Sequence, residues 1–223
     1  MTGLNEAFII TKEKRDELVE KDAKSDEIIR PILRGKDIGR NSYTFADLYV
    51  ITAYKGISLI MKETYPAVFE HLKQFEERLR KRGQCEGTAT SPGSNQHHWL
   101  ELDNNVSREK LDNFLRQKIY YREISDAMNA VFVEDYIFIT NKSYMMTGKD
   151  VNKNLLSFLN SNIFNRIMLQ QANLTGGKGP SFFKNMPLPL VIKSEDRITE
   201  DVLNRFYDLS PEEISYIEKA SNK

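Results

Sequence analysis

The sequence predicts an α+β fold, with a mixed β-sheet, a long core helix and short C-terminal helices. Short apolar runs that read as strands lie between helical segments, without the regular strand–helix–strand rhythm of a parallel sheet. The strongest helical pattern covers residues 151–172, where apolar residues at helical spacing form a wide face that should pack in the core. An apolar share of 40% and a charged share of 29% are those of an ordinary globular protein.

The first half of the chain shows clear start and stop signals. Strands are expected at 4–10 and 48–52, and helices at 12–22, 66–82 and 108–117. Thr11 is a good N-cap for the first helix, Pro66 suits the first turn of the second, and Gly83 is the expected terminator. Ser25 can cap a short turn that Pro31 should end.

Two irregular stretches separate the remaining elements. Residues 83–98, rich in Gly, Ser, Asn and Pro, should form a long loop, and such loops are usually functional or disordered. The second stretch, Gly176–Pro180, is glycine-rich, but it lacks the Ser or Thr of a phosphate-binding P-loop. Strands are expected at 118–124, 130–133, 136–140, 143–147 and 188–192, and two helices at 201–207 and 211–220.

The length is in the range of one large domain or of one domain with a small appendage. We expect residues 1–192 to form the main domain and residues 193–223 to form a helical extension of the same domain. Cys85 is the one cysteine, which excludes an internal disulfide and favours a reduced, cytoplasmic setting. No signal peptide or membrane-spanning segment is expected. The abrupt strand-like start also fits a domain cut from a larger protein.

Formal net charge is zero, which argues mildly against nucleic-acid binding. The charges are unevenly distributed, however: the charged residues within 141–190 are mostly basic, and those within 194–223 are mostly acidic. One interpretation is a basic working face and an acidic surface that avoids DNA or meets a partner domain. The other is that charges are simply scattered, as in many globular domains.

Catalytic motifs are missing from the sequence. There is no dinucleotide fingerprint, no Asn-Pro-Pro-Tyr-type methyltransferase motif and no nucleophile elbow. The adjacent His97 and His98 lack the spacing of a metal site, and a nucleophilic pair with Cys85 is an open but weak alternative. Whether the chain is an enzyme is therefore left open, and no catalytic or metal-binding residue is predicted.

Seven segments, in order, resemble motifs of the TaqI-like specificity, or target-recognition, domain of type IIG restriction–modification enzymes and related adenine-specific DNA methyltransferases. They are TGLNEAFII at 2–10, PILRGKDI at 31–38, WLEL at 99–102, KIYYREIS at 118–125, LLSFLNS at 155–161, PLP at 187–189 and YDLSPEEI at 207–214. The resemblance covers nearly the whole chain.

The resemblance implies a domain that recognises a specific sequence in double-stranded DNA, as part of a type II (IIG-like) restriction–modification enzyme in phage defence. Such a domain directs adenine-N6 methylation, with or without cleavage, by a separate catalytic region. No cofactor is expected in this chain, whereas S-adenosylmethionine and Mg²⁺ are expected for the parent enzyme. The expected partners are double-stranded DNA and the methyltransferase or nuclease domains of the parent chain, with no membrane.

Side chains that fit this role can be chosen by their chemistry. Arg and Lys bind guanine edges and phosphates, and Asn and Gln bind adenine edges. The residues predicted to contact DNA are Arg34, Lys36, Arg40, Asn95, Gln96, His97, His98, Arg122, Lys178, Ser181 and Lys184. The Arg34–Lys36 turn is either a phosphate contact or an ordinary charged turn, and the loop around residue 95 is either a base-reading loop or a variable insertion.

The basic run Arg78–Arg82 is explained well enough by attraction to the end of its helix.

Two other functions remain open for the chain. The chain as a whole could instead be a protein-interaction module of a phage-defence methyltransferase, acting through its acidic C-terminal helices. It could also be a small hydrolase with a nonstandard site around His97 and His98.

Overall fold

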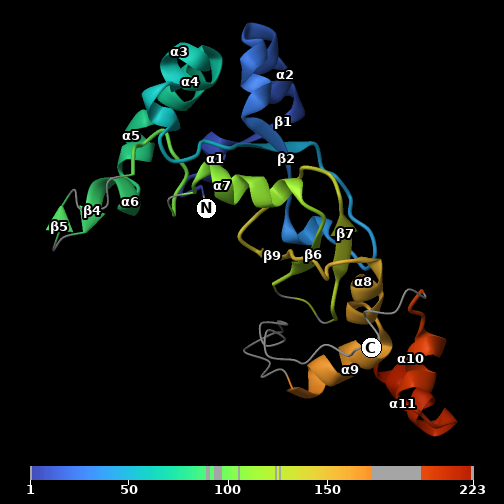
Figure 1. Cartoon of the computed structure of the whole chain (residues 1–223). Coiled ribbons are helices and arrows are strands. Elements are labelled where there is room, and N and C mark those ends of the chain that lie inside the picture. Colours follow the sequence, from blue (N-terminus) through green and yellow to red (C-terminus); the bar gives the residue numbers. More distant parts are fainter. Residues whose placement is uncertain are drawn as a thin grey trace. The chain divides into compact units, whose positions relative to one another are not determined.

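The computed structural model describes residues 2–88, 91–92, 97–104, 106–123, 125, 127–171 and 197–221, and helices and strands mix in them as an α+β fold. The chain packs as two compact units (Figure 1). Unit 1 comprises Met1–Leu33, Phe45–Arg116 and Tyr136–Phe138, and unit 2 comprises Arg34–Thr44, Gln117–Asp135 and Ile139–Lys223. Each unit is therefore built from segments that are separate in the sequence.

The sheet of unit 1 has the strand order β1-β3-β2-β8. Its strands are β1 (Ile9–Thr11), β3 (Leu48–Ile51), β2 (Ile29–Leu33) and β8 (Phe138–Ile139). β3 pairs antiparallel with both β1 and β2, so that Val50 lies opposite Ile9 on one side and Arg30 on the other. The predicted strand at 48–52 is confirmed, and it ends one residue early.

The first predicted strand, residues 4–10, is wrong over most of its length. Asn5–Phe8 form a helical turn, α1, and only Ile9 begins β1. Gly3, at φ +63°, turns the chain into α1, and the backbone N–H of Ile9 donates to the carbonyl of Asn5. Burial of Ala7 and Phe8 from this turn outweighs the strand-like apolar pattern.

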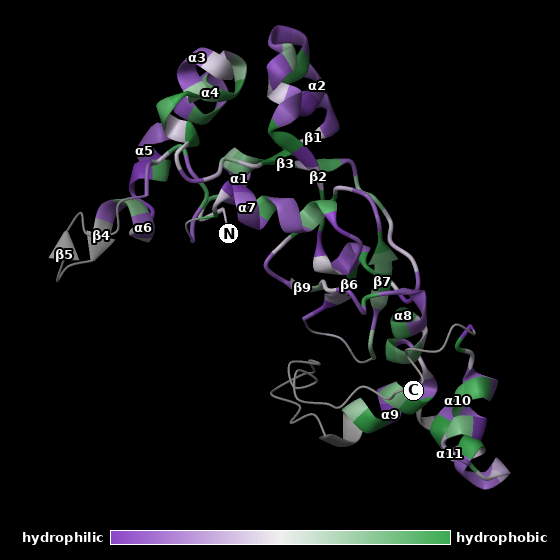
Figure 2. Cartoon of the chain, in the orientation of Figure 1, coloured by the Kyte–Doolittle hydropathy of each residue, from purple (hydrophilic) through white to green (hydrophobic). Residues whose placement is uncertain are grey.

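The helix predicted at 12–22 is confirmed as α2 (Lys12–Lys21), and Thr11 caps it by accepting from the backbone N–H of Lys14. Its surface is mostly hydrophilic (Figure 2), with Leu18 as its buried anchor. The next turn, η1 (Ala23–Glu27), is capped by Asp22 rather than by Ser25, which is itself buried. Pro31 does not end this turn, because the chain has already entered β2 at Ile29.

The helix predicted at 66–82 is divided in two. α4 (Pro66–Lys73) begins at the proline as expected, and α5 (Glu76–Arg80) follows after a break. The N–H of Phe75 donates to Leu72, a tighter turn that brings the Phe75 ring against His71. Gly83 starts the next helix, α6 (Gly83–Glu86), instead of ending this one.

Short elements complete unit 1. They are η3 (Ile57–Leu59), α3 (Met61–Thr64), α7 (Arg108–Asp112), η4 (Asn113–Leu115) and a hairpin of β4 (Gly87–Thr88) and β5 (Ser91–Pro92). The predicted helix at 108–117 is thus α7 and η4, and the predicted loop at 83–98 contains α6 and the hairpin. An apolar cluster of this unit includes Phe8, Ile51, Leu72 and Leu79, all fully buried.

The sheet of unit 2 has three antiparallel strands in the order β7-β6-β9. They are β6 (Lys118–Arg122), β7 (Ala130–Val133) and β9 (Ser143–Met146), all three within predicted strands. Tyr121 lies opposite Ala130 on one side and opposite Tyr144 on the other. The turn η2 (Gly35–Asp37) also belongs to this unit.

The long core helix predicted at 151–172 is two helices, α8 (Lys153–Leu159) and α9 (Asn162–Gln171). Its apolar face is confirmed, since Leu155, Leu159 and Phe164 are buried in the core of unit 2. The break falls at Asn160 and Ser161, which are 2% exposed and use their side chains on backbone groups. Asn and Ser often compete with helical hydrogen bonds in this way.

The two C-terminal helices are confirmed as α10 (Glu200–Phe206) and α11 (Pro211–Ser221). Thr199 caps α10 by accepting from the N–H of Val202. The predicted strand at 188–192 and the glycine-rich segment Gly176–Pro180 lie outside the described residues.

Candidate nucleic-acid interface

The turn that carries Arg34, Lys36 and Arg40 is built around the carboxylate of Asp37. Asp37 accepts from the backbone N–H of Arg34 at 2.8 Å and from the Arg34 guanidinium at 2.9 Å (Nε) and 2.8 Å (Nη2). Burial acts to raise the pKa of Asp37, but these hydrogen bonds and the charges of Arg34 and Lys36 outweigh it and hold the pKa below its usual value. Arg34 is therefore paired and held in place.

Gly35 brings this turn against the start of β9. A Cβ at Gly35 would lie 2.8 Å from the backbone carbonyl oxygen of Lys142 and 3.5 Å from Oγ of Ser143. Only glycine leaves room for such an approach. Lys36 and Lys142 are both exposed, so the contact joins two backbone segments that each carry a solvated cation.

Arg122, at the end of β6, is directed at the same turn. Its Nε donates to the carbonyl of Ile38 at 2.6 Å, and its Nη2 donates to the carbonyl of Lys36 at 3.3 Å. The predicted site residues Arg34, Lys36 and Arg122 are therefore brought together, with Arg122 holding the turn through its backbone.

Arg40 and Asn41 form the outer part of the turn. Arg40 is exposed and lies 3.6 Å from a carboxylate oxygen of Glu200. Asn41 adopts a left-handed conformation, φ +64°, which asparagine tolerates better than most residues. Its backbone N–H donates to the carbonyl of Ala130 at 2.9 Å.

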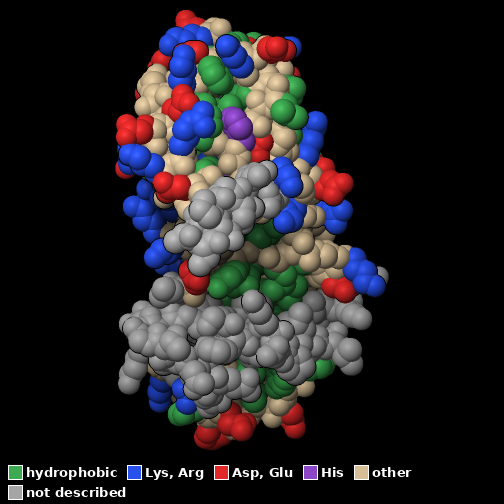
Figure 3. All heavy atoms as spheres, turned by 90° about the vertical axis from the view of Figure 1, so that its left-hand side faces the viewer, with side chains coloured by type: hydrophobic (Ala, Val, Ile, Leu, Met, Phe, Trp, Pro, Cys, Tyr) green, Lys and Arg blue, Asp and Glu red, His purple; other side chains and the backbone are tan. Residues whose placement is uncertain are grey.

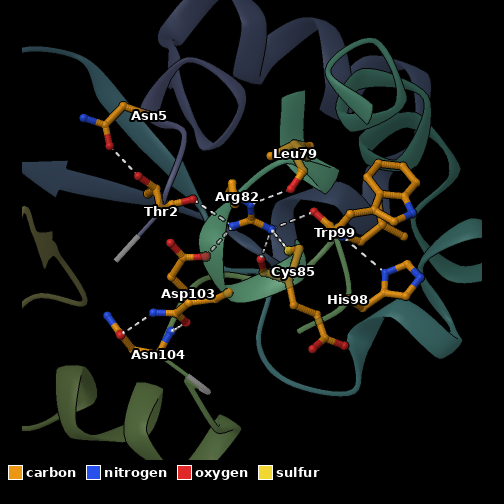
Figure 4. A network of polar contacts seen from close by, with 12 residues as sticks. Thr2, Asn5, Leu79, Arg82, Cys85, His98, Trp99, Asp103 and Asn104 are labelled. Atoms are coloured by element: carbon orange, nitrogen blue, oxygen red, sulfur yellow. Dashed lines mark hydrogen bonds and ion pairs between the residues drawn. The ribbon is translucent and has the colours of Figure 1, made fainter. Parts of the chain in front are cut away.

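His97 and His98 belong to unit 1. Nδ1 of His98 accepts from the backbone N–H of Leu100 at 3.2 Å, and its ring lies 5.8 Å from that of Trp99 (Figure 4). Partial loss of hydration around its ring lowers the pKa of His98. The backbone N–H of His97 donates to the carbonyl of Gln84. Five other predicted contacts lie outside the described residues: Asn95, Gln96, Lys178, Ser181 and Lys184.

Arg82 corrects the interpretation of the basic run at 78–82. Its side chain is 4% exposed and donates to Asp103 at 2.8 Å and to the carbonyls of Thr2, Leu79, Trp99 and Glu101 (Figure 4). It is a buried anchor of unit 1 rather than a partner of the helix dipole. Arg78, Arg80 and Lys81 are exposed and pair with Glu6, Glu76 and Glu77. Figure 3 shows positively and negatively charged side chains intermixed on the upper part of the face in view.

The aromatic residues and Cys85 serve packing in this structure. Trp99, Tyr120 and Tyr121 are buried, which agrees with core positions rather than with stacking on an extruded base. The thiol of Cys85 accepts from Arg82 at 3.4 Å, and burial raises its pKa, the opposite of an activated nucleophile. Glu101 is buried and accepts from the N–H of Gly56 and the hydroxyl of Ser58.

The described residues offer neither a metal site nor a membrane-spanning helix. They contain no group of three or more His, Cys, Asp or Glu that could hold a metal ion. None of their helices has the length and apolar character that crossing a membrane requires.

Several residues of the turn region were missed by sequence reasoning. Asp37, Asn41, Lys142 and Asn160 organise or extend the candidate site, and none was predicted to contact DNA. Asp37 lies inside a recognised motif, PILRGKDI, and Asn160 inside LLSFLNS, so the motifs carried the signal. Their partners are distant in the sequence and could not be chosen from it.

The family of TaqI-like C-terminal specificity domains matches residues 30–183, and this chain belongs to that family. No curated protein matches it.

A similar solved structure is that of the type IIL restriction–modification enzyme MmeI in complex with DNA. The TM-score is 0.55 at 15% sequence identity, and the similarity covers 81% of this chain and 22% of that one. At this identity the likeness concerns the fold. The chain spans about a fifth of the length of its structural relative.

Proposed function

We propose that this chain recognises a specific sequence in double-stranded DNA, as the target-recognition domain of a type II (IIG-like) restriction–modification enzyme. The observation that carries the proposal is the turn of unit 2, where Lys36 and Arg40 are exposed on a backbone tied down by Asp37 and Arg122. Family membership and a fold shared with a DNA-bound enzyme support it.

The proposed mechanism divides the contacts by chemistry. Lys36, Arg40 and Lys142 contact phosphates, which set the position of the domain on the duplex without reading sequence. Base edges are read by side chains near residue 95, with Asn95, Gln96, His97 and His98 as candidates, and Lys178, Ser181 and Lys184 add contacts. Arg34 and Arg122 keep the turn in shape, because their guanidiniums already bind groups of the turn.

The wider assignment concerns the parent enzyme. We propose residues 1–192 as the target-recognition domain and 193–223 as its helical extension. The parent methylates adenine at N6, and cleaves DNA if it carries a nuclease, in a separate catalytic region in the cytoplasm. S-adenosylmethionine and Mg²⁺ would bind that region, and its domains are the protein partners of this chain.

The first experiment is selection of bound duplexes from a randomised DNA library, repeated across a series of salt concentrations. Enrichment of a short motif, with affinity falling steeply as salt rises, is the expected result. Salt-sensitive binding without enrichment would mean that base reading requires the catalytic region. An absence of binding at low salt would overturn DNA recognition by this chain.

Charge variants then locate the interface. Lys36→Gln and Lys142→Gln should each weaken binding to every duplex and lower the salt slope by about 1. Lys81→Gln is the matched control, since Lys81 is an exposed lysine of unit 1 paired with Glu77. An equal change in all three variants would contradict the placement of the interface.

A second candidate function is protein interaction by the C-terminal helices. Phe206 and Tyr216 are large apolar residues, 52% and 57% exposed, on helices with several acidic residues. This reading predicts binding to the parent's catalytic region without DNA, and weaker binding for Phe206→Ser. Unchanged binding of the Phe206→Ser variant would contradict this second function.

A further inference from the structure

Asn160 occupies the break between α8 and α9 and binds a single residue of the neighbouring sheet. Its Oδ1 accepts from the backbone N–H of Ala130 at 3.1 Å, and its Nδ2 donates to the carbonyl of Ala130 at 2.9 Å. Ala130 is in β7, an edge strand of the sheet. The carboxamide therefore satisfies both backbone groups of an edge position, as a neighbouring strand would.

The same carboxamide reaches the basic turn. Nδ2 of Asn160 also donates to Oδ1 of Asn41 at 2.7 Å, and the backbone N–H of Asn41 donates to the carbonyl of Ala130 at 2.9 Å. Three segments thus meet in one set of hydrogen bonds: the turn, the edge of β7 and the helix break. Asn41 follows directly after Arg40, so the contact lies next to an exposed cation.

A second anchor holds the turn from its other side. Arg122 donates to the carbonyls of Lys36 and Ile38, so the segment from Lys36 to Asn41 is tied down at both ends. The anchor at Asn41 brings no charge to the DNA, because the carboxamides of Asn41 and Asn160 are neutral. Their effect on binding would be through the placement of the turn.

We propose that Asn160, through Asn41, is a positioning residue that sets the register of the turn on DNA. This inference rests on the proposed function. If phosphate contacts fix register, a loosened turn should harm binding to the preferred sequence more than binding to any other duplex. Its signature is a lower ratio of specific to non-specific affinity, with no change in charge.

Asn41→Gly isolates the contact. Glycine keeps the left-handed backbone at position 41 and removes the carboxamide that Asn160 binds. Affinity for the selected duplex should fall about 3- to 10-fold, the range of one hydrogen bond, and affinity for a scrambled duplex should not change. Asn160→Ala should show a larger loss, and it should also unfold more easily, because the backbone N–H of Ala130 loses its acceptor.

Asn104→Gly is a closely matched control. Asn104 is also exposed, has φ +70°, and accepts on Oδ1 from a side-chain amide, that of Gln84, but it belongs to unit 1. It should leave the ratio of specific to non-specific affinity unchanged. Thermal unfolding of all three variants separates loss of structure from loss of register.

The outcomes distinguish the two claims. Specific binding by the unmodified chain, with a ratio unchanged in Asn41→Gly or changed equally in Asn104→Gly, would overturn the positioning role and leave the proposed function standing. If the unmodified chain binds no DNA, both claims fail. A reduced ratio in Asn41→Gly alone, at unchanged melting temperature, would support the positioning role.

Discussion

Arg82 is the clearest case of a residue whose role depends on its burial. One guanidinium satisfies four backbone carbonyls and the carboxylate of Asp103, and it lies over the ring of Phe8 at 5.3 Å. These carbonyls come from segments far apart in the sequence. Arg82 therefore joins the N-terminal residues, α5 and the segment that holds Trp99.

Replacement of Arg82 by alanine should destabilise the chain by about 3–5 kcal/mol, because the carboxylate of Asp103 and several carbonyls lose their buried partner. The free energy of unfolding from urea titration is the measurement. Lys81→Ala, which removes an exposed pair, is the control and should have a small effect. Similar losses in both variants would contradict the anchoring role.

His71 predicts how stability depends on pH. Its Nε2 lies 2.9 Å from the carbonyl oxygen of Ala7, and burial lowers its pKa below the usual 6.5. The unfolded chain therefore binds a proton at His71 more readily than the folded chain does. The stability contributed by neutral His71 is present above pH 6.5 and is lost as the pH falls toward the lowered pKa.

Unfolding in urea at pH 7.5 and 5.5 tests this prediction. The unmodified chain should be less stable at the lower pH, and His71→Gln, which keeps an N–H donor but does not titrate, should lose less between the two. His98 has a pKa lowered in the same direction, so some pH dependence should remain in the variant. An identical loss in both proteins would exclude His71 as a source.

At the scale of elements, close packing of the turn against β9 decides the shape of the candidate site. The backbone at Gly35 approaches the carbonyl of Lys142 more closely than any side chain would permit. The break between α8 and α9 acts on the same turn from another direction through Asn160. Two irregular points of the chain thus shape one surface.

Gly35→Ala should displace η2, because its Cβ would lie 2.8 Å from a backbone oxygen that has little freedom to move. We expect a loss of about 1–3 kcal/mol in stability and weaker binding to the selected duplex. Gly83→Ala is the control: among described residues no atom lies within 4 Å of its added Cβ, and alanine favours the helix α6. Normal DNA binding by Gly35→Ala would argue against the turn as part of the interface.

At the scale of the whole molecule, each of the two units has an apolar core of its own residues. Leu79 is fully buried in unit 1 and Leu159 is fully buried in unit 2. The cluster around Leu79 consists of residues of unit 1, and the cluster around Leu159 consists of residues of unit 2. Each unit should therefore respond first to damage in its own core.

Hydrogen exchange of the backbone amides can show this separation. Leu159→Ala, which should cost about 2–5 kcal/mol, is expected to speed exchange most in β6 and β7. Leu79→Ala should act most on β1 and β3. Equal acceleration across both units in either variant would show that the chain opens as one cooperative body.

The sequence by itself determined the features that depend on near neighbours. The α+β class, the helix capped by Thr11, the strands of unit 2 and the C-terminal helices followed from periodicity and capping. Family membership followed from ordered motifs, and so did the basic turn as a candidate site.

Only the tertiary structure decided which polar side chains are bound within the fold and which face solvent. Arg82 and Lys81 are adjacent and chemically alike, yet one is buried and the other exposed. The apolar face at 151–172 was predicted, but the break in that helix at Asn160 was not. Asn160 forms hydrogen bonds with Ala130 and Asn41, which lie 30 and 119 residues away in the sequence. Helical spacing reports which face is apolar, whereas these partners are brought near only when the chain has folded.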